Sequence, residues 1–182
     1  MKGALRRHIV LIGMMGAGKT AIGTELARRL QAPFTDSDTE IEAAAAMTIA
    51  EIFARDGEAF FRSQETRVLA RILAGAPAVV STGGGAWMGA QNRALIDKGG
   101  LSVWLNCDLD ILWHRVRQRS HRPLLRTPDP KATLAALLVE RNPVYARAQM
   151  EFPARRGETV EAATSRLLAQ IRATHPHILE VK

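Results

Sequence analysis

A phosphate-binding loop near the start of the chain constrains the fold more than any other feature. Residues 13–20 read Gly-Met-Met-Gly-Ala-Gly-Lys-Thr, which matches the P-loop pattern in full. An apolar run at 8–12 precedes this loop and an amphipathic pattern at 19–30 follows it. Glycines let such a loop curl its N–H groups toward phosphate oxygens, and the helix N-terminus adds a favourable dipole. The motif predicts nucleotide binding, with Lys19 reaching the β- and γ-phosphates and Thr20 holding Mg²⁺.

Short apolar runs alternate with helical patterns along the rest of the chain. The strand predictions are 8–12, 33–35, 78–82 and 101–105, with a weaker fifth near 150–152. The helix predictions are 19–30, 48–54, 58–73, 89–98, 108–116, 131–140 and 159–173. Such alternation predicts a parallel sheet covered on both faces, which binds ligands at the carboxyl ends of its strands.

Composition narrows the class of protein. The 182 residues are 47% hydrophobic, which suits one compact globular domain rather than a disordered chain. The net charge of +7 comes mainly from 20 Arg, a side chain suited to phosphate and carboxylate but also to nucleic acid. Cys107 is the only cysteine, so an internal disulfide is excluded and a cytoplasmic location is expected. The basic and apolar N-terminus imitates a signal peptide, but its apolar run ends inside the P-loop, and we predict no membrane span.

Two acidic residues follow the second predicted strand. Asp36 and Asp38 are two apart on extended backbone, so both can face one cleft. One carboxylate can contact the water shell of Mg²⁺ while the other accepts a hydrogen bond from a substrate hydroxyl. Alternatively, Ser37 or Asp38 caps a helix that begins here, an ordinary role for either residue type.

Two further segments suggest a site for a second substrate. Arg62 and Glu65 share a helix face and together offer a fork for a carboxylate, although Arg62 can also form a surface ion pair with Glu58. Three glycines at 83–85 end the third strand, which is more than a turn requires and favours close approach of a ligand to the backbone.

Arginines are dense between residues 115 and 126, where a basic lid over a triphosphate would explain them. RNA binding is the alternative, but no aromatic residue lies between Gln118 and Asp129 to stack on a base. Arg141, followed by Tyr145, is placed at the end of a helix, where an arginine also complements the helix dipole.

The combination of these motifs resembles the shikimate kinase family. The P-loop, Asp36-x-Asp38, Phe61-Arg62 with Glu65, the triple glycine, Arg122-Pro-Leu-Leu and Arg141 with Tyr145 occur in the family's order, between about residues 8 and 149. The resemblance implies a five-stranded α/β P-loop kinase, similar to nucleoside monophosphate kinases. It also implies one domain over 1–182, with an acceptor-binding segment at about 37–66 and a lid at about 117–127.

The resemblance further implies a role for each matching residue. ATP and Mg²⁺ are the implied co-substrate and metal, and shikimate is the implied acceptor, in a cytoplasmic monomer that binds neither nucleic acid nor membrane. The residues implied for shikimate are Asp38, Phe53, Phe61, Arg62, Glu65, Gly83, Gly84, Gly85 and Arg141. Those implied for nucleotide are Gly16, Ala17, Gly18, Lys19, Thr20, Ala21, Arg117 and Arg122, with Asp36 and Thr20 for the metal. Lys19, Asp38 and Arg122 are the catalytic candidates.

Three positions depart from the family pattern. Ala21 stands where a second hydroxyl is common, which removes one contact to the α-phosphate, and Arg147 and Ala148 stand where an acidic residue is common. Arg117 is the candidate for stacking on adenine, with Arg155 or Arg156 as its partner. The alternatives are a gluconate-type kinase, a nucleic-acid-linked ATPase and a module that only binds nucleotide.

Overall fold

Five parallel strands form one sheet in the computed structural model, which describes residues 5–117 and 126–180. The strands are β1 (His8–Ile12), β2 (Phe34–Asp36), β3 (Val79–Ser81), β4 (Gly100–Asn106) and β5 (Met150–Pro153). They lie in the order β2-β3-β1-β4-β5, and each pairing is parallel. The predicted parallel sheet is confirmed, and the weak fifth candidate is one of its edge strands.

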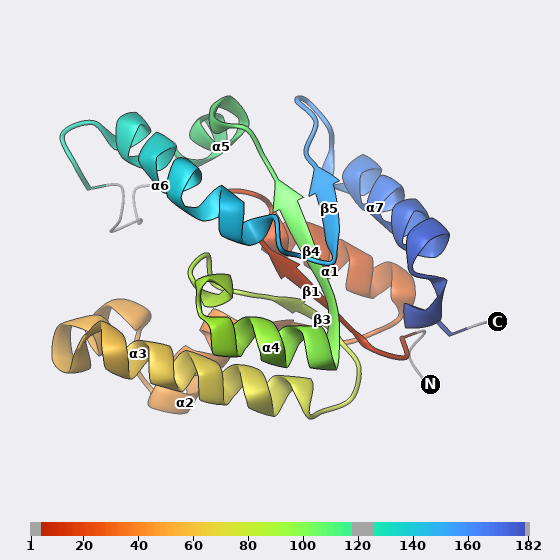
Figure 1. Ribbon diagram of the computed structural model, residues 1–182, viewed down its shortest axis with the longest axis horizontal. Helices are drawn as coiled ribbons and strands as arrows, with labels where there is room; N and C mark the ends of the chain where they lie inside the picture. The colour runs from red at the N-terminus through yellow and green to blue at the C-terminus, as the bar shows by residue number, and fades with distance from the viewer. Residues whose placement is uncertain (1–4, 118–125, 181–182) are drawn as a thin grey trace.

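Helices cover both faces of this sheet. They are α1 (Lys19–Leu30), α2 (Ser37–Ala45), α3 (Ile49–Leu73), α4 (Ala90–Gly99), α5 (Leu109–Val116), α6 (Pro130–Tyr145) and α7 (Val160–Thr174), with short 3₁₀ turns η1 (Ala86–Met88) and η3 (Pro176–Ile178). The chain moves one way along the sheet from β1 to β2 and the other way from β3 to β4. Right-handed crossovers therefore place α1 and α4 on opposite faces, as Figure 1 shows.

The central strand explains why the sheet holds together. Ile9, Val10, Leu11 and Ile12 of β1 are fully buried, because helices cover both of their faces. A second, smaller core lies outside the sheet. It joins α2 and α3 through Ile41, Ile52, Phe61 and Val68. The segment predicted to bind an acceptor therefore has apolar packing of its own.

Two helices depart from the prediction. Helix α2, which the sequence suggested only through the alternative capping role of Ser37 or Asp38, begins directly after β2. Helix α6 continues through Pro143 to Tyr145 instead of ending near residue 140. Sequence favours an earlier end because proline lacks the N–H that a helix interior uses. The last turn of α6 is held instead by Tyr145, which is fully buried, stacks on Trp104 and donates a hydrogen bond to the Gly84 carbonyl.

The break inside α3 agrees with the two helices predicted for this region. Gly57 has φ 82° and ψ 175°, values outside the helical region, so the helical run is interrupted there. A capping box holds the start of α3. The Thr48 hydroxyl accepts from the Glu51 amide at 3.2 Å, while the Glu51 carboxylate accepts from the Thr48 amide at 2.7 Å.

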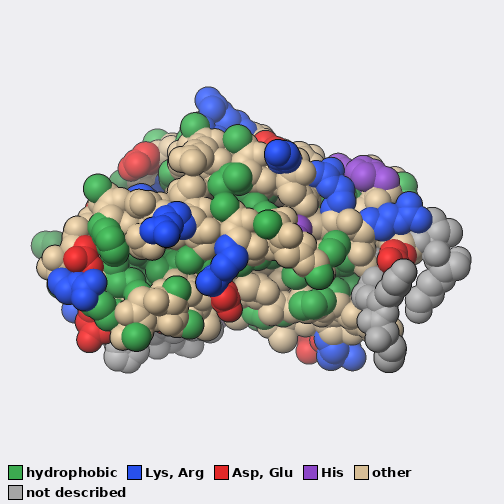
Figure 2. Space-filling view, turned by 90° about the horizontal axis from the view of Figure 1, so that it is seen from below, with side chains coloured by type: hydrophobic (Ala, Val, Ile, Leu, Met, Phe, Trp, Pro, Cys, Tyr) green, Lys and Arg blue, Asp and Glu red, His purple; other side chains and the backbone are tan. Residues whose placement is uncertain are grey.

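On one face of the molecule the positive charge is scattered. On the face shown in Figure 2, Lys and Arg side chains are mostly separated by other residue types instead of forming one continuous stripe. Within residues 5–117 and 126–180, no helix is long and apolar enough to cross a membrane.

Candidate active site

A cleft of about 1070 Å³ opens where β1, β2 and β3 end. Its position agrees with the rule for parallel α/β sheets. The predicted residues that line it are Gly16, Gly18, Lys19, Thr20, Ala21, Asp36, Asp38, Gly83 and Gly84. The P-loop lies between two ends of the cleft, one bounded by β2 and β3 and the other by Arg115 and the start of α7.

The P-loop adopts the conformation that its glycines permit. Gly13, Gly16 and Gly18 have φ of 138°, 80° and 96°, which side chains rarely tolerate, and Gly18 is the N-cap of α1. The Lys19 ammonium donates to the carbonyls of Gly13 at 2.8 Å and Met14 at 2.9 Å, so the side chain folds back over its own loop. These contacts hold a cation beside a ring of backbone N–H donors, an arrangement suited to phosphate.

Asp36 joins the P-loop to the helix after β2. The Thr20 hydroxyl donates to Asp36 Oδ2 at 3.2 Å, and Asp36 Oδ1 accepts from the amides of Asp38 at 3.0 Å and Thr39 at 3.4 Å. The cap of this helix is therefore Asp36, and the alternative that placed it at Ser37 or Asp38 is wrong. Asp38 is free of that structural task.

Asp38 lies in an environment that resists its negative charge. Burial is the main cause that raises its pKa to about 6, and the nearby carboxylates of Asp36 and Glu65 add to the effect. Its Oδ1 atom is buried and has no hydrogen-bond partner among the residues that the structure describes. A carboxylate with a raised pKa and an unused acceptor is suited to receive a hydroxyl proton.

Arg62 does not line the cleft itself but lies against Gly85, next to the lining residue Gly84, and carboxylates on its own helix hold it there. Its guanidinium pairs with the buried Glu65 at 3.0 Å and with the exposed Glu58 at 3.5 Å, so both predicted partners are used. The guanidinium also lies over the Phe61 ring, 5.2 Å from its centroid, and Phe53 packs on Phe61 with ring centroids 4.7 Å apart. Burial raises the pKa of Glu65, while the Arg62 charge opposes that rise.

Three consecutive glycines bring three charged side chains together. A Cβ at Gly83 would lie 2.7 Å from Asp38 Oδ1, and one at Gly85 would lie 2.5 Å from Arg62 Nη2. A Cβ at Gly84 would lie 3.6 Å from Arg141 Nη1, an ordinary contact. Three side chains from different helices therefore each lie against one of three successive glycines. The triple glycine thus makes room for protein groups, while its predicted contact with a ligand stays a prediction.

Unsatisfied polar atoms lie at and beside this end of the cleft, where Asp38 and Gly84 line it. Ser37 Oγ, Asp38 Oδ1 and Arg141 Nε are buried without hydrogen-bond partners in the described part of the chain. Buried polar groups are normally paired, so a polar ligand or ordered water is expected to satisfy these atoms. A donor on Arg141 and an acceptor on Asp38 suit a small molecule that carries both a carboxylate and hydroxyl groups.

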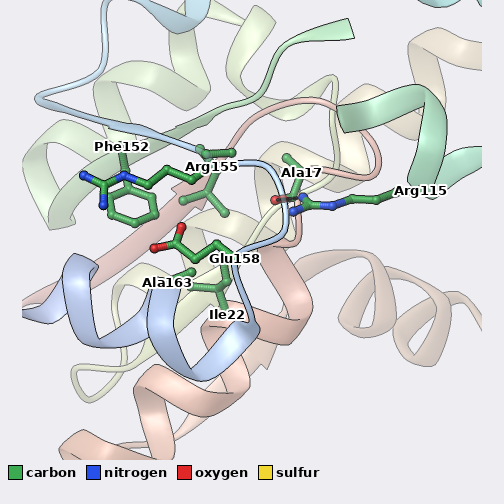
Figure 3. Close-up of a pocket in the computed structure, with 9 residues that line it drawn as sticks. Ala17, Ile22, Arg115, Phe152, Arg155, Glu158 and Ala163 are labelled. Atoms are coloured by element: carbon green, nitrogen blue, oxygen red, sulfur yellow. Dashed lines mark hydrogen bonds between the residues drawn. The ribbon is translucent and has the colours of Figure 1, made fainter. Parts of the chain in front are cut away.

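The opposite end of the cleft uses an arginine that the sequence interpretation missed. Arg115 Nη1 donates to the carbonyls of Gly16 and Ala17 at 3.2 Å each, and Figure 3 shows this guanidinium directed at Ala17. Arg117 does not line the cleft; it lies on the surface beside His114. We therefore replace Arg117 by Arg115 as the candidate for the nucleotide. Arg115 lies three and four residues after the buried Leu112 and Ile111, a helical spacing that could have identified it.

The other predicted residues near this end have separate positions. Arg155 lines a small pocket of about 20 Å³ with Ala17, Arg115 and Glu158, whereas Arg156 points to Asp110 at 3.9 Å and is exposed. Arg122 and most of the predicted lid lie outside the described residues.

The residues at the P-loop fit a magnesium ion. Thr20 and Asp36 place a hydroxyl and a carboxylate side by side, which are oxygen ligands of the kind that Mg²⁺ prefers. In the described ranges, no group of three or more His, Cys, Asp or Glu could hold a metal by itself. This agrees with the way Mg²⁺ binds beside nucleotides, where phosphates and waters supply most of the ligands.

The fold and the cleft together define a P-loop kinase. Comparison with known proteins gives the family. The sequence model of shikimate kinase matches residues 15–172. The curated shikimate kinase of Cereibacter sphaeroides is 58% identical over 97% of this chain and 87% of its own, and that of Ruegeria pomeroyi is 53% identical over 98% and 91%. The chain belongs to the shikimate kinase family.

Solved structures separate this family from its neighbours. Shikimate kinase from Acinetobacter baumannii in complex with shikimate superposes with a TM-score of 0.86 at 36% identity, covering 93% of this chain and 94% of that chain. A gluconokinase from Sinorhizobium meliloti has a TM-score of 0.55 at 17% identity, which shows a shared fold alone. The resemblance to shikimate kinases is therefore confirmed, and the gluconate-type alternative gains no support beyond the fold.

Proposed function

We propose that the chain transfers the γ-phosphoryl group of ATP to the 3-hydroxyl of shikimate, giving shikimate 3-phosphate and ADP on the route to chorismate and the aromatic amino acids. The observation that carries this proposal is the convergence of Asp38, Arg62 and Arg141 on the three glycines at 83–85. Two cations and one carboxylate with a raised pKa complement a substrate that has one carboxylate and several hydroxyls.

The donor side uses the P-loop. The backbone N–H groups and Lys19 bind the phosphates of ATP, and Lys19 stabilises charge on the transferring group. Thr20 and Asp36 would hold Mg²⁺, which would neutralise phosphate charge. Arg115 and the segment before α7 border the nucleoside end, because the phosphates occupy the middle of the cleft and the acceptor occupies the other end.

The acceptor side uses the converging side chains. Arg62, oriented by Glu65, and Arg141 hold the shikimate carboxylate, while Phe53 and Phe61 border the ring. Asp38 accepts a hydrogen bond from the attacking hydroxyl. As the oxygen forms its bond to phosphorus, the bond to ADP breaks and the hydroxyl proton passes to Asp38. Because this transition state is loose, orientation of the hydroxyl contributes as much as basicity. Arg122 is assigned to the γ-phosphoryl on its motif alone.

A coupled ADP-release assay tests the substrate assignment. Shikimate should stimulate ADP release well above the basal rate, whereas gluconate, nucleoside monophosphates and RNA should not. Lys19→Ala serves as the matched negative variant, since it removes the phosphate contact from the same protein. Equal stimulation by gluconate, or no stimulation by shikimate, would contradict the proposal.

We also propose that the enzyme acts as a cytoplasmic monomer without nucleic-acid or membrane partners. On the one face that Figure 2 shows, the basic side chains are scattered, so this face lacks the continuous basic surface that nucleic-acid binding favours. Cys107, the only cysteine, is buried, which fits a protein that makes no disulfide.

A further inference from the structure

The turn between β5 and α7 borders the nucleoside end of the cleft, and the contacts at its tip are long: an exposed ion pair of Arg156 with Asp110 at 3.9 Å and a hydrogen bond from the Glu158 amide to the Arg155 carbonyl at 3.3 Å. Arg155, Arg156 and Gly157 are exposed, and Gly157 has φ 71°. Glu158 and Thr159, which follow them, line the cleft. A wall that contacts a nucleotide must keep its shape, so some other group has to hold this turn.

Arg166 lies on α7, the helix that follows the turn, and contacts both ends of the turn. Its Nη2 atom donates to the carbonyl of Pro153, where β5 ends, at 2.8 Å. Its Nε and Nη2 atoms donate to the two carboxylate oxygens of Glu158, where the turn rejoins the helix, at 3.0 and 2.7 Å. One planar guanidinium therefore fixes the distance between the two ends, a task for which a forked donor is suited.

The surroundings of Arg166 make this brace rigid. The guanidinium lies over the Phe152 ring, 4.0 Å from its centroid, and the side chains of Arg166 and Glu158 are only 21% and 12% exposed. Figure 3 shows the Glu158 carboxylate directed toward that ring. Its hydrogen bonds with Arg166 are the main cause that holds the pKa of Glu158 below its usual range, so this carboxylate is ionised at neutral pH. Partly buried, bidentate pairs of this kind are ordered, unlike most surface ion pairs.

We infer that Arg166 is a positioning residue for the nucleotide: it fixes the turn at 154–159 as a preformed wall at the nucleoside end of the cleft. Arg166 itself is absent from the residues that line the cleft and acts through Pro153 and Glu158. Preformed binding surfaces gain affinity because less conformational freedom is lost on binding. This inference rests on the proposed function only in that a nucleotide occupies the cleft.

Direct binding of ADP, measured by calorimetry without shikimate, tests the inference. Arg166→Ala should weaken ADP binding about tenfold, and Arg166→Lys, which keeps the charge but loses the fork, should fall between it and the parent. Arg172→Ala is the matched control, an exposed arginine on the same helix, and should bind ADP like the parent. In turnover assays the KM for ATP should rise while kcat and the KM for shikimate stay within about twofold.

Thermal unfolding separates positioning from stability. If Arg166→Ala binds ADP as tightly as the parent, or if kcat and both KM values worsen together with the melting temperature, Arg166 is only a structural residue and the inference is wrong. Should Arg166→Ala fail to fold, the Arg166→Lys variant decides on the same two criteria. A parent that binds ADP with this dependence on Arg166 but ignores shikimate would overturn the proposed function and support the inference.

Discussion

At the scale of single residues, Asp38 shows how a site group can oppose stability. Its pKa is raised from 3.8 to about 6 in the folded protein, so the folded state holds this proton more tightly than the unfolded state does. By linkage, the contribution of Asp38 to the free energy of unfolding falls as pH rises from about 4 through about 6. At neutral pH the ionised carboxylate therefore destabilises the fold, which is a feature of groups kept for chemistry.

The first prediction follows for Asp38→Asn. Turnover at saturating shikimate should fall by about 10²–10⁴-fold, because the variant cannot take the hydroxyl proton. The melting temperature at pH 7.5 should rise by a few degrees, of order 1 kcal/mol, and this gain should vanish near pH 4, where Asp38 is itself neutral. Parallel assays of turnover and calorimetry across pH check both effects.

Asp129→Asn is the control, since Asp129 caps α6 through the Ala132 amide and Asn caps about as well. The Asp129→Asn variant should change neither turnover nor melting temperature. In the parent, kcat/KM should decline below about pH 6 as Asp38 becomes protonated. A parent rate that is flat down to pH 5, or an Asp38→Asn variant within a few-fold of the parent, would remove Asp38 from proton transfer.

Residue identities were easier to predict than residue partners. Lys19, Thr20 and Asp38 line the cleft as their motifs indicated, because each motif is local and its strand fixes where it ends. The cap of α2 was misplaced because Asp36, Ser37 and Asp38 can all cap a helix, and only the contact between Thr20 and Asp36 shows which one is oriented to do so.

At the scale of elements, Gly57 divides the acceptor-binding segment into two helical pieces. Nothing lies within 4 Å of where a Cβ would be, so a side chain would meet no neighbouring atom. Glycine is required here because its positive φ is an angle that other residues rarely adopt. Phe53 lies before the break and Phe61 after it, and their rings pack together. The break thus sets how two residues proposed for the shikimate pocket face each other.

The second prediction compares Gly57→Ala with Gly157→Ala. Both positions have positive φ and open space, so each variant should lose about 1–3 kcal/mol of stability. Gly57→Ala should raise the KM for shikimate with little effect on ADP binding, whereas Gly157→Ala should do the reverse. Calorimetry and initial rates check this. If both variants changed both affinities equally, the break in α3 would have no specific role in acceptor binding.

Element boundaries were predicted best where propensity and packing agree. Strand β1 and helix α1 begin and end as predicted, since the P-loop glycines separate them sharply. Helix α6 was predicted too short, because its last turn depends on the buried contacts of Tyr145 with Trp104 and Gly84, which no local pattern reveals.

At the scale of the whole molecule, the net charge of +7 has a kinetic meaning. Both proposed substrates are anionic, so the field of the protein should speed their encounter at low ionic strength. The third prediction is that kcat/KM falls several-fold between about 10 mM and about 500 mM NaCl, while kcat at saturation changes little. Steady-state rates over a salt series measure this. A matched series in glycerol at low salt controls for medium effects on encounter.

RNA provides the opposing outcome. If added RNA stimulated ATP hydrolysis, and that stimulation were lost with salt, the charge would serve a nucleic-acid partner instead. A kcat/KM that is independent of salt would show that the charge steers neither substrate.

The parallel architecture itself could be predicted from the alternation of strands and helices, because crossovers leave few ways to connect such elements. The meeting of Asp38, Arg62 and Arg141 could not, because these residues come from α2, α3 and α6, which are distant in sequence. Their meeting depends on tertiary packing around the glycines at 83–85.

Those glycines have a consequence for inhibitor resistance. A compound that fills the space beside Asp38, Arg62 and Arg141 could be evaded by a mutation that adds bulk to the pocket floor. At Gly83 and Gly85, any side chain would first collide with Asp38 or Arg62, so an escape mutation there would also displace a group proposed to bind the substrate. Gly84 alone leaves ordinary room for a methyl group. Resistance mutations that add a side chain at this strand end should therefore be tolerated at Gly84 but not at Gly83 or Gly85.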